Sequence, residues 1–487
     1  MLMRGGRLNK QVLQGCFLLL CVLIASTASA QSLRFSNHRE VRIPEYAVLR
    51  IGPFYSSVTF SQAVGYRYTS GEGEGLDYLF SNHRGVFLKD GSDFPLVSTL
   101  DMQNYLIISP TMDLDISLRA SYSHYPLNTQ EDEFIFDMVE EGIAGNFSTE
   151  FSLTPYVKGT AFDNISYRTD YIDARGLIDR YGGQAYEHLQ NDLGANFDWL
   201  MAKDQNMGLS VSRTDVLPGE DTFKEQERVS YTEALSYQWM INPMVMAGAS
   251  ASFVQNSYTA VTNRPDSSFH TYSVFSTVRL TEHTVGSVSL GYAQASVPEE
   301  GGLFGEALDN SGMIGSVSLK TELSRELEHE LSYARSMVGG FASAYEMNDK
   351  CSYHLNWKEE GVLSASLFAE YLKSVPSEIM GEYTDWTSGV SLSLPVTRLV
   401  SIDLSTTYSV RENGGGEQIA DESSVELTSD YNTWSSRIGA SVPVMQRDRN
   451  GMMFAAYAEH IERSGDSDVL EYSRNIIAAT LTYSHVF

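Results

Sequence analysis

The chain has 487 residues, with 62 acidic and 34 basic side chains and a formal net charge of −28. This acidity excludes nucleic acid as a natural partner, because binding to phosphates requires clustered Lys and Arg. An aromatic content of 11% excludes intrinsic disorder, and a mean hydropathy of −0.21 excludes a bundle of membrane-spanning helices. For a soluble protein, the length alone would predict roughly three domains.

The first thirty residues have the pattern of a secretory signal peptide. Arg4, Arg7 and Lys10 precede a short apolar stretch, and Ala28-Ser29-Ala30 supplies the small residues that signal peptidase accepts. We predict cleavage after residue 30; an uncleaved anchor is the alternative, although the apolar stretch is short for a membrane span. Cleavage would leave a single cysteine, Cys351, so the exported chain would have no internal disulfide.

From about residue 58 onward, apolar and polar side chains alternate with a period of two, as in β-strands with two different faces. Nine short turns interrupt this pattern, at residues 110–112, 153–155, 202–205, 241–243, 281–284, 324–326, 358–361, 395–397 and 446–451. Longer polar connections lie between them, at 71–94, 128–141, 168–183, 297–310 and 411–422. The turns predict about 18–20 strands, within a range of about 16–22, and residues 423–444 fit either one long strand or two.

Short turns at one end of the strands and long loops at the other are typical of a transmembrane β-barrel of the bacterial outer membrane. A soluble β-sandwich also alternates, and it is the alternative. Trp199, Trp239 and Trp357 each precede a short turn on the apolar parity, which fits an aromatic girdle at the periplasmic membrane interface. We therefore predict an all-β fold with a single antiparallel barrel over residues 57–487, after a periplasmic segment at 31–56, in place of three domains.

In such a barrel the polar positions of each strand would face the lumen. On this basis we predict that the lumen-facing residues include Gln190, Asp192, Asn196, Asp198, Arg228, Ser230, Thr232, Gln238, Asp403, Ser405, Thr407, Thr480, Thr482 and Ser484.

The carboxy-terminal segment alternates in the same way. Leu481, Tyr483 and Phe487 share the apolar face, and a terminal Phe with apolar or aromatic residues at alternate positions resembles the strand signal that outer-membrane barrels present to their assembly machinery. His485 departs from this pattern, because an aromatic or aliphatic residue is commoner there.

Two stretches of the mature chain carry a family resemblance. Residues 43–46 (Ile-Pro-Glu-Tyr) run into 52–54 (Gly-Pro-Phe) and the first strand, and residues 472–476 (Tyr-Ser-Arg-Asn-Ile) lead to Phe487. They resemble the β-barrel porins of the second group, a sparsely characterised family of bacterial outer-membrane proteins. Where family members often carry an Asn-containing motif after the first strand, this chain has Tyr66-Arg67-Tyr68. The resemblance implies a barrel with a pore and a link to export of surface polysaccharide, and it implies no catalytic residue.

No motif points to catalysis, to a cofactor or to a metal. The Gly-rich segment 71–75 carries carboxylates that would repel a phosphate, and the ten histidines are scattered without metal-ligand spacing. Acidic runs at 131–141 and 220–227 fall in predicted outer loops. They fit solvated loops, or alternatively a field at the pore mouth or binding of divalent cations that bridge to lipopolysaccharide.

The sequence therefore predicts a passive outer-membrane channel for small hydrophilic or sugar-containing solutes, and not an enzyme. The acid excess predicts a modest preference for cations or neutral sugars over anions. A dedicated barrel for exopolysaccharide export, with lumenal tyrosines stacking on sugar rings, and a barrel-borne adhesin or structural protein are the alternatives. The expected partners are outer-membrane lipid and lipopolysaccharide, the barrel assembly machinery and, for the export alternative, polysaccharide-export components.

Overall fold

The computed structural model describes residues 49–486, with gaps at 73–90, 110–111, 128–132, 138, 141–142, 145–146, 172–184, 220–223, 225, 260–265, 298–307, 339–344, 360–361, 377–381, 398, 414–429, 448–449 and 466–470. The predicted signal peptide and most of the predicted periplasmic segment lie outside these residues. Within the described part of the chain, no helix is long and apolar enough to cross a membrane.

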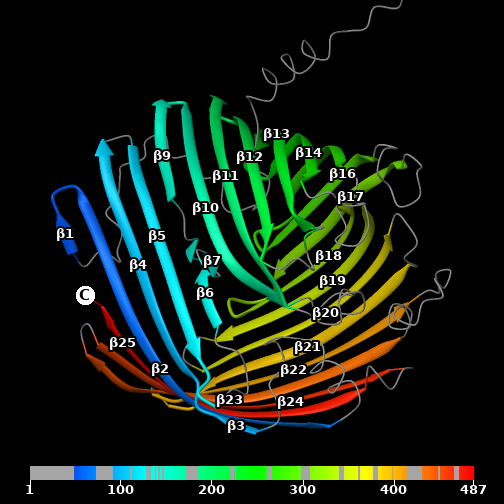
Figure 1. The fold of residues 1–487 in the computed structure, drawn as a ribbon. Coiled ribbons are helices and arrows are strands. Elements are labelled where there is room, and N and C mark those ends of the chain that lie inside the picture. The colour runs from blue at the N-terminus through cyan, green and yellow to red at the C-terminus, as the bar shows by residue number, and fades with distance from the viewer. Residues whose placement is uncertain are drawn as a thin grey trace, which may run out of the picture.

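The described residues form a closed antiparallel β-barrel of 20 strands (Figure 1). Each strand pairs with the next in the chain, and the sheet closes where the first long strand meets the last, through a register that runs from Thr59↔Val486 to Glu72↔Ser473. The barrel strands are β2 (Phe54–Glu72), β4 (Leu96–Ser109), β5 (Met112–His124), β9 (Phe147–Thr154), β10 (Val157–Tyr171), β11 (Ala185–Ala202), β12 (Gln205–Pro218), β13 (Arg228–Asn242), β14 (Val245–Tyr258), β15 (Ser267–Arg279), β16 (Thr284–Val297), β17 (Leu308–Glu322), β18 (Leu327–Val338), β19 (Glu346–Glu359), β20 (Leu363–Pro376), β21 (Tyr383–Pro395), β22 (Ser401–Asn413), β23 (Tyr431–Arg447), β24 (Asn450–Gly465) and β25 (Tyr472–Val486).

Short additional strands accompany the barrel strands. β1 (Leu49–Ile51) and β3 (Gly91–Asp93) both pair with β2, while β7 (Val139–Glu140) pairs with β8 (Ile143–Ala144) in a separate two-stranded sheet. β6 (Glu133–Asp137) pairs with β5 and touches β10, so it continues the position of the short strand β9 between these two neighbours. In the described part of the chain, closure gives each of the 20 barrel strands a partner on both sides, which is how a sheet satisfies its backbone in hydrocarbon.

The predicted hairpins agree with the strand order. All nine predicted short turns fall between consecutive antiparallel strands, and the strand number lies at the upper end of the predicted 18–20. Within 423–444 the described residues form one strand, β23. The first long strand begins at Phe54 instead of residue 57, and β6 and β7 occupy part of the segment 128–141 that was expected to be a loop.

In the observed strand register, side chains of the same kind lie on the same face of the sheet all around the barrel. One face holds the large apolar side chains that are exposed, such as Leu193, Val274, Leu290, Val317 and Ile438. The opposite face carries cross-strand hydroxyl pairs with oxygen–oxygen distances of 2.6–3.1 Å: Thr99–Ser121, Ser250–Ser273, Ser289–Ser316, Ser332–Ser352, Ser366–Ser391 and Ser401–Ser441. The first face is the outer wall and the second is the inner wall, as the alternation predicts.

Some phenylalanines lie on the otherwise polar inner wall, where each packs over a glycine of the neighbouring strand. A Cβ on Gly248 would lie 2.4 Å from the ring of Phe275, and a Cβ on Gly194 would lie 2.5 Å from the ring of Phe162. Each phenylalanine is the direct cross-strand partner of its glycine. The ring therefore covers backbone that glycine leaves bare, which is a known way to stabilise glycine in a sheet.

The outer wall carries an aromatic row near each end of the strands. Near the short turns, Trp199, Trp239 and Trp357 are all exposed. Near the opposite ends lie Tyr122, Tyr231, Tyr272, Tyr292, Tyr333, Trp386, Tyr408 and Trp434, which we call the outer girdle. Along β13, Trp239 and Tyr231 are eight residues apart, or about 20 Å along the barrel axis at a tilt of about 40°. That spacing approaches the ~25 Å apolar band of an outer-membrane barrel.

Candidate functional site on the inner wall

The strand register assigns a place to every predicted lumen residue. Each one lies on the same parity as the hydroxyl pairs of its sheet, hence on the inner wall. Most are spread over separate strands and do not converge. The structure does bring some of them to partners: Ser230 donates to Asn256 Oδ1 at 2.7 Å, and Asp403 accepts from Ser393 at 2.6 Å.

Asp192 accepts hydrogen bonds from two side chains. Its carboxylate accepts from Gln190 Nε2 at 2.7 Å and from the Thr214 hydroxyl of the neighbouring strand. Both donors are neutral side chains of the inner wall.

A second feature of the inner wall is a run of alternating tyrosines and arginines near the outer ends of β21–β25. Arg411 lies over the rings of Tyr383 and Tyr431, at 4.5 Å and 5.8 Å from their centroids. Arg463 lies over Tyr431 at 4.6 Å and over Tyr472 at 5.4 Å. The sequence Tyr383, Arg411, Tyr431, Arg463, Tyr472 thus crosses five adjacent strands, one residue from each, and we call it the Tyr–Arg ladder.

The two arginines of the ladder are held differently. Arg411 is only 3% exposed and makes a bidentate pair with Asp385, at 2.7 Å from Nε and 2.6 Å from Nη2. Arg463 is partly exposed and donates from Nε to Thr433 Oγ1 at 3.1 Å. Arg411 is therefore a fixed structural support, whereas Arg463 presents a guanidinium group to the lumen.

A further arginine–tyrosine pair, Arg437 with Tyr457, lies on β23 and β24 closer to the short turns than the Tyr–Arg ladder. The Arg437 guanidinium lies 4.0 Å from the ring centroid of Tyr457 on the neighbouring strand, and both side chains are on the inner wall. Guanidinium groups donate to hydroxyl and carboxylate oxygens, and an aromatic ring beside them adds an apolar contact surface.

Sequence reasoning did not find the Tyr–Arg ladder. Its members are scattered between residues 383 and 472, and each resembles an ordinary lumen-facing strand residue. Only the pairing of β21 to β25 makes them neighbours, so no local signal could have identified them. The structure thus adds Arg437 and Arg463 to a lumen wall for which the sequence predicts mainly Ser, Thr, Asn, Gln and Asp.

The remaining predicted residues lie on the outer wall or outside the described residues. Leu481 and Tyr483 are exposed on the outer wall, and the Tyr483 hydroxyl donates to Asn450 Oδ1 at 2.7 Å. Phe487 and, in the acidic run at 220–227, residues 220–223 and 225 fall outside the described residues; Glu227 of that run accepts from the Thr259 hydroxyl at 2.6 Å, and for 131–141 only strand bounds are described. Among the residues that are described, no cluster of His, Cys, Asp and Glu could hold a metal ion.

The chain matches no family model and no curated protein. Its fold is similar to that of the FrpB iron transporter from Neisseria meningitidis (F5-1 variant), with a TM-score of 0.48 and 8% identity over 88% of this chain and 82% of that one. The copper transporter OprC gives 0.49 and 11% identity over 91% and 82%. Pseudomonas aeruginosa OprD gives 0.41 and 9% identity over 89% and 95%. Membership of the second-group porin family stays a prediction.

Proposed function

We propose that this protein is an outer-membrane channel for the passive passage of small hydrophilic, sugar-containing solutes. The observation that carries the proposal is the closed 20-strand barrel with an apolar outer wall between two aromatic rows and a hydroxyl-lined inner wall. A barrel of more than about 16 strands is wide enough to hold an aqueous channel. An outer wall of this composition fits lipid, and the inner wall fits water and polyhydroxylated solutes.

The Tyr–Arg ladder supports sugars as the solute class. Its tyrosines are partly exposed to the lumen, and Arg463 and Arg437 offer hydrogen-bond donors beside tyrosine rings. A solute that pauses on this surface would be bound weakly and released, as conduction requires.

Planar-bilayer recording of the refolded protein tests the proposal. We expect stepwise conductance and a concentration-dependent block by added oligosaccharide. The double variant Arg437→Gln, Arg463→Gln should weaken this block severalfold. Arg213→Gln is the matched control, because Arg213 lies on the outer wall in an ion pair with Asp215 and should leave the block unchanged. No conductance from a folded, heat-modifiable protein would refute the channel.

The ladder also favours a second candidate, a conduit for exopolysaccharide export. The four ladder residues other than the buried Arg411 lie on four strands, and such a spread would suit an extended polymer better than a single sugar. Block measured against oligosaccharides of increasing length separates the two candidates. A block that strengthens up to several sugar units supports the polymer, whereas equal block by monosaccharides and oligosaccharides supports small solutes.

A further inference from the structure

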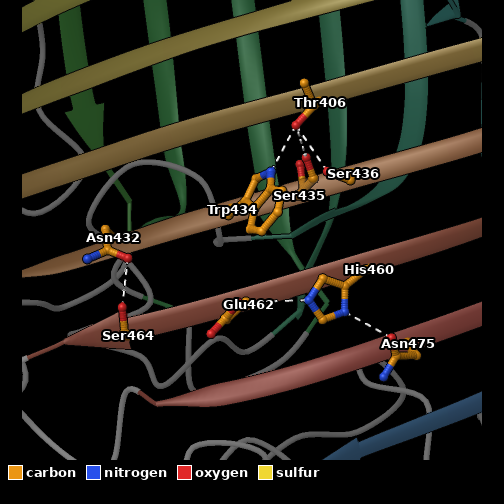
Figure 2. A network of polar contacts seen from close by, with 9 residues as sticks. All are labelled: Thr406, Asn432, Trp434, Ser435, Ser436, His460, Glu462, Ser464 and Asn475. Carbon is orange, nitrogen blue, oxygen red and sulfur yellow. Dashed lines mark hydrogen bonds and ion pairs between the residues drawn. The ribbon is translucent and has the colours of Figure 1, made fainter.

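The outer wall carries a row of polar side chains where an apolar surface is expected. Thr406, Ser436, His460 and Asn475 are successive cross-strand partners on β22, β23, β24 and β25. Trp434 and Glu462 lie beside this row, and Figure 2 shows these side chains with the opposite wall of the barrel behind them. We call the six residues the outer polar cluster.

The outer polar cluster consists of two groups of contacting side chains, Trp434 with Thr406 and Ser436, and His460 with Asn475 and Glu462 (Figure 2). The Trp434 indole donates to Thr406 Oγ1 at 2.9 Å, and the Thr406 and Ser436 hydroxyls are 3.0 Å apart. His460 Nδ1 is 2.9 Å from Asn475 Oδ1, and His460 Nε2 is 3.9 Å from Glu462 Oε2. The cluster is thus oriented, and its Glu462 carboxylate is more than half exposed, at 56%.

The height of the cluster coincides with the outer girdle. Trp434 belongs to both the cluster and the girdle, and its cross-strand partner on β22 is Tyr408 of the girdle. On the other side, Tyr68 of β2 is the partner of Ile477, which lies one pleat below Asn475. Polar and ionisable side chains are costly in hydrocarbon, but at this level they meet the headgroup region. The cluster is therefore placed to contact the polar part of a lipid.

Directly below the cluster, toward the short-turn end, lies an apolar groove of about 630 Å³. Its wall includes Leu392, Leu404, Ile438, Ala458 and Ile477. The small side chain of Ala458 between Ile438 and Ile477 makes the depression. The next row of the outer wall is Ala440, Ala456 and Ala479, so the low surface continues toward the middle of the barrel. A groove of this shape, open along the wall and headed by polar groups, fits an acyl chain.

The charge of the site decides which headgroup it suits. At the level of the cluster and of the groove, the described outward-facing residues of β22–β25 include no Lys or Arg, and the nearest charged group is Glu462. A phosphate would meet a carboxylate without a permanent counter-charge, which is unfavourable. Sugar hydroxyls can donate to Glu462 and accept from Ser436 or His460, and the exposed face of Trp434 offers a stacking surface.

We propose that the groove and the outer polar cluster form a binding site for an acylated glycolipid with an uncharged sugar head. The acyl chain lies along Leu404, Ile438 and Ile477, and the sugar lies against Glu462, Ser436 and Trp434. This inference rests on the proposed membrane location of the barrel.

Lipid-specific fluorescence quenching tests the site. The protein with Trp434 as its one tryptophan (Trp199, Trp239, Trp357 and Trp386 replaced by Phe) is reconstituted in phosphatidylcholine vesicles. A small fraction of brominated monoglycosyl diacylglycerol, phosphatidylglycerol or phosphatidylcholine is then added. We expect the glycolipid to quench Trp434 at a severalfold lower mole fraction than either phospholipid. Replacement of His460 by Leu together with Glu462 by Gln should remove the preference.

A second protein that keeps only Trp239, near the short turns, is the control. The three brominated lipids should quench Trp239 alike. Equal quenching of Trp434 by all three lipids, or strongest quenching by phosphatidylglycerol, would overturn the glycolipid site. Absence of quenching at both tryptophans by every lipid would instead refute the membrane location, and so the failure of the two proposals can be told apart.

Discussion

Replacement of Asp385 by Ala is expected to destabilise the barrel more than any other single ion-pair substitution on the described strands. Asp385 holds both Nε and Nη2 of Arg411, whose side chain is 3% exposed and packed between Tyr383 and Tyr431. In the variant, the guanidinium stays buried without its counter-charge, and the tyrosine rings cannot replace two charged hydrogen bonds.

The magnitude follows from the burial of the two partners. Loss of one partner from a buried ion pair costs about 3–5 kcal/mol. Asp385 itself is 20% exposed, so water reaches its site and we expect the lower end, about 3 kcal/mol. The double variant Asp385→Leu, Arg411→Met removes both charges together with their desolvation cost, and it should lie within about 1 kcal/mol of the wild type.

Urea unfolding in phospholipid vesicles, followed by the heat-modifiable band and by tryptophan fluorescence, measures these differences. Asp215→Ala is the matched control, because the Arg213–Asp215 pair has a similar 2.7 Å contact while the Arg213 side chain is 47% exposed. It should cost at most about 1 kcal/mol. The reasoning fails if Asp385→Ala costs no more than Asp215→Ala, or if the double variant is as unstable as the single one.

Two further predictions concern the backbone and the pore. Gly248→Ala should destabilise the barrel by about 1–3 kcal/mol, because the new Cβ would lie 2.3 Å from the Tyr237 carbonyl oxygen. Gly286→Ala should be tolerated, because the nearest atom to its Cβ, in the Leu280 side chain, would be 3.6 Å away. Equal unfolding midpoints for the two variants would contradict this explanation. Reversal potentials in a salt gradient should show a modest cation preference from the net charge of −28, which Arg437→Gln, Arg463→Gln should increase; anion selectivity of the wild type would contradict the prediction.

The sequence was sufficient for the class of fold because its strongest signals are local. Alternation places Leu193 and Asp192 on opposite faces whatever strands lie beside them, and Pro243 or Pro155 marks a turn from its own backbone restriction. The strand number and the nine hairpins followed from these signals. Two exceptions to the apolar–polar alternation are the inward-facing Phe275 and Phe162. Each ring covers a glycine on the neighbouring strand, and a period of two along one strand cannot reveal such a partner.

What the sequence by itself determined is the two-faced strand, and with it the polar inner wall and the apolar outer wall. Only the tertiary structure decided which residues of different strands meet, because register depends on the pairing of whole strands and on closure of the barrel. Tyr383, Arg411 and Tyr431 became a stacked surface, and Ser436, His460 and Asn475 became neighbours above a groove, through that pairing alone.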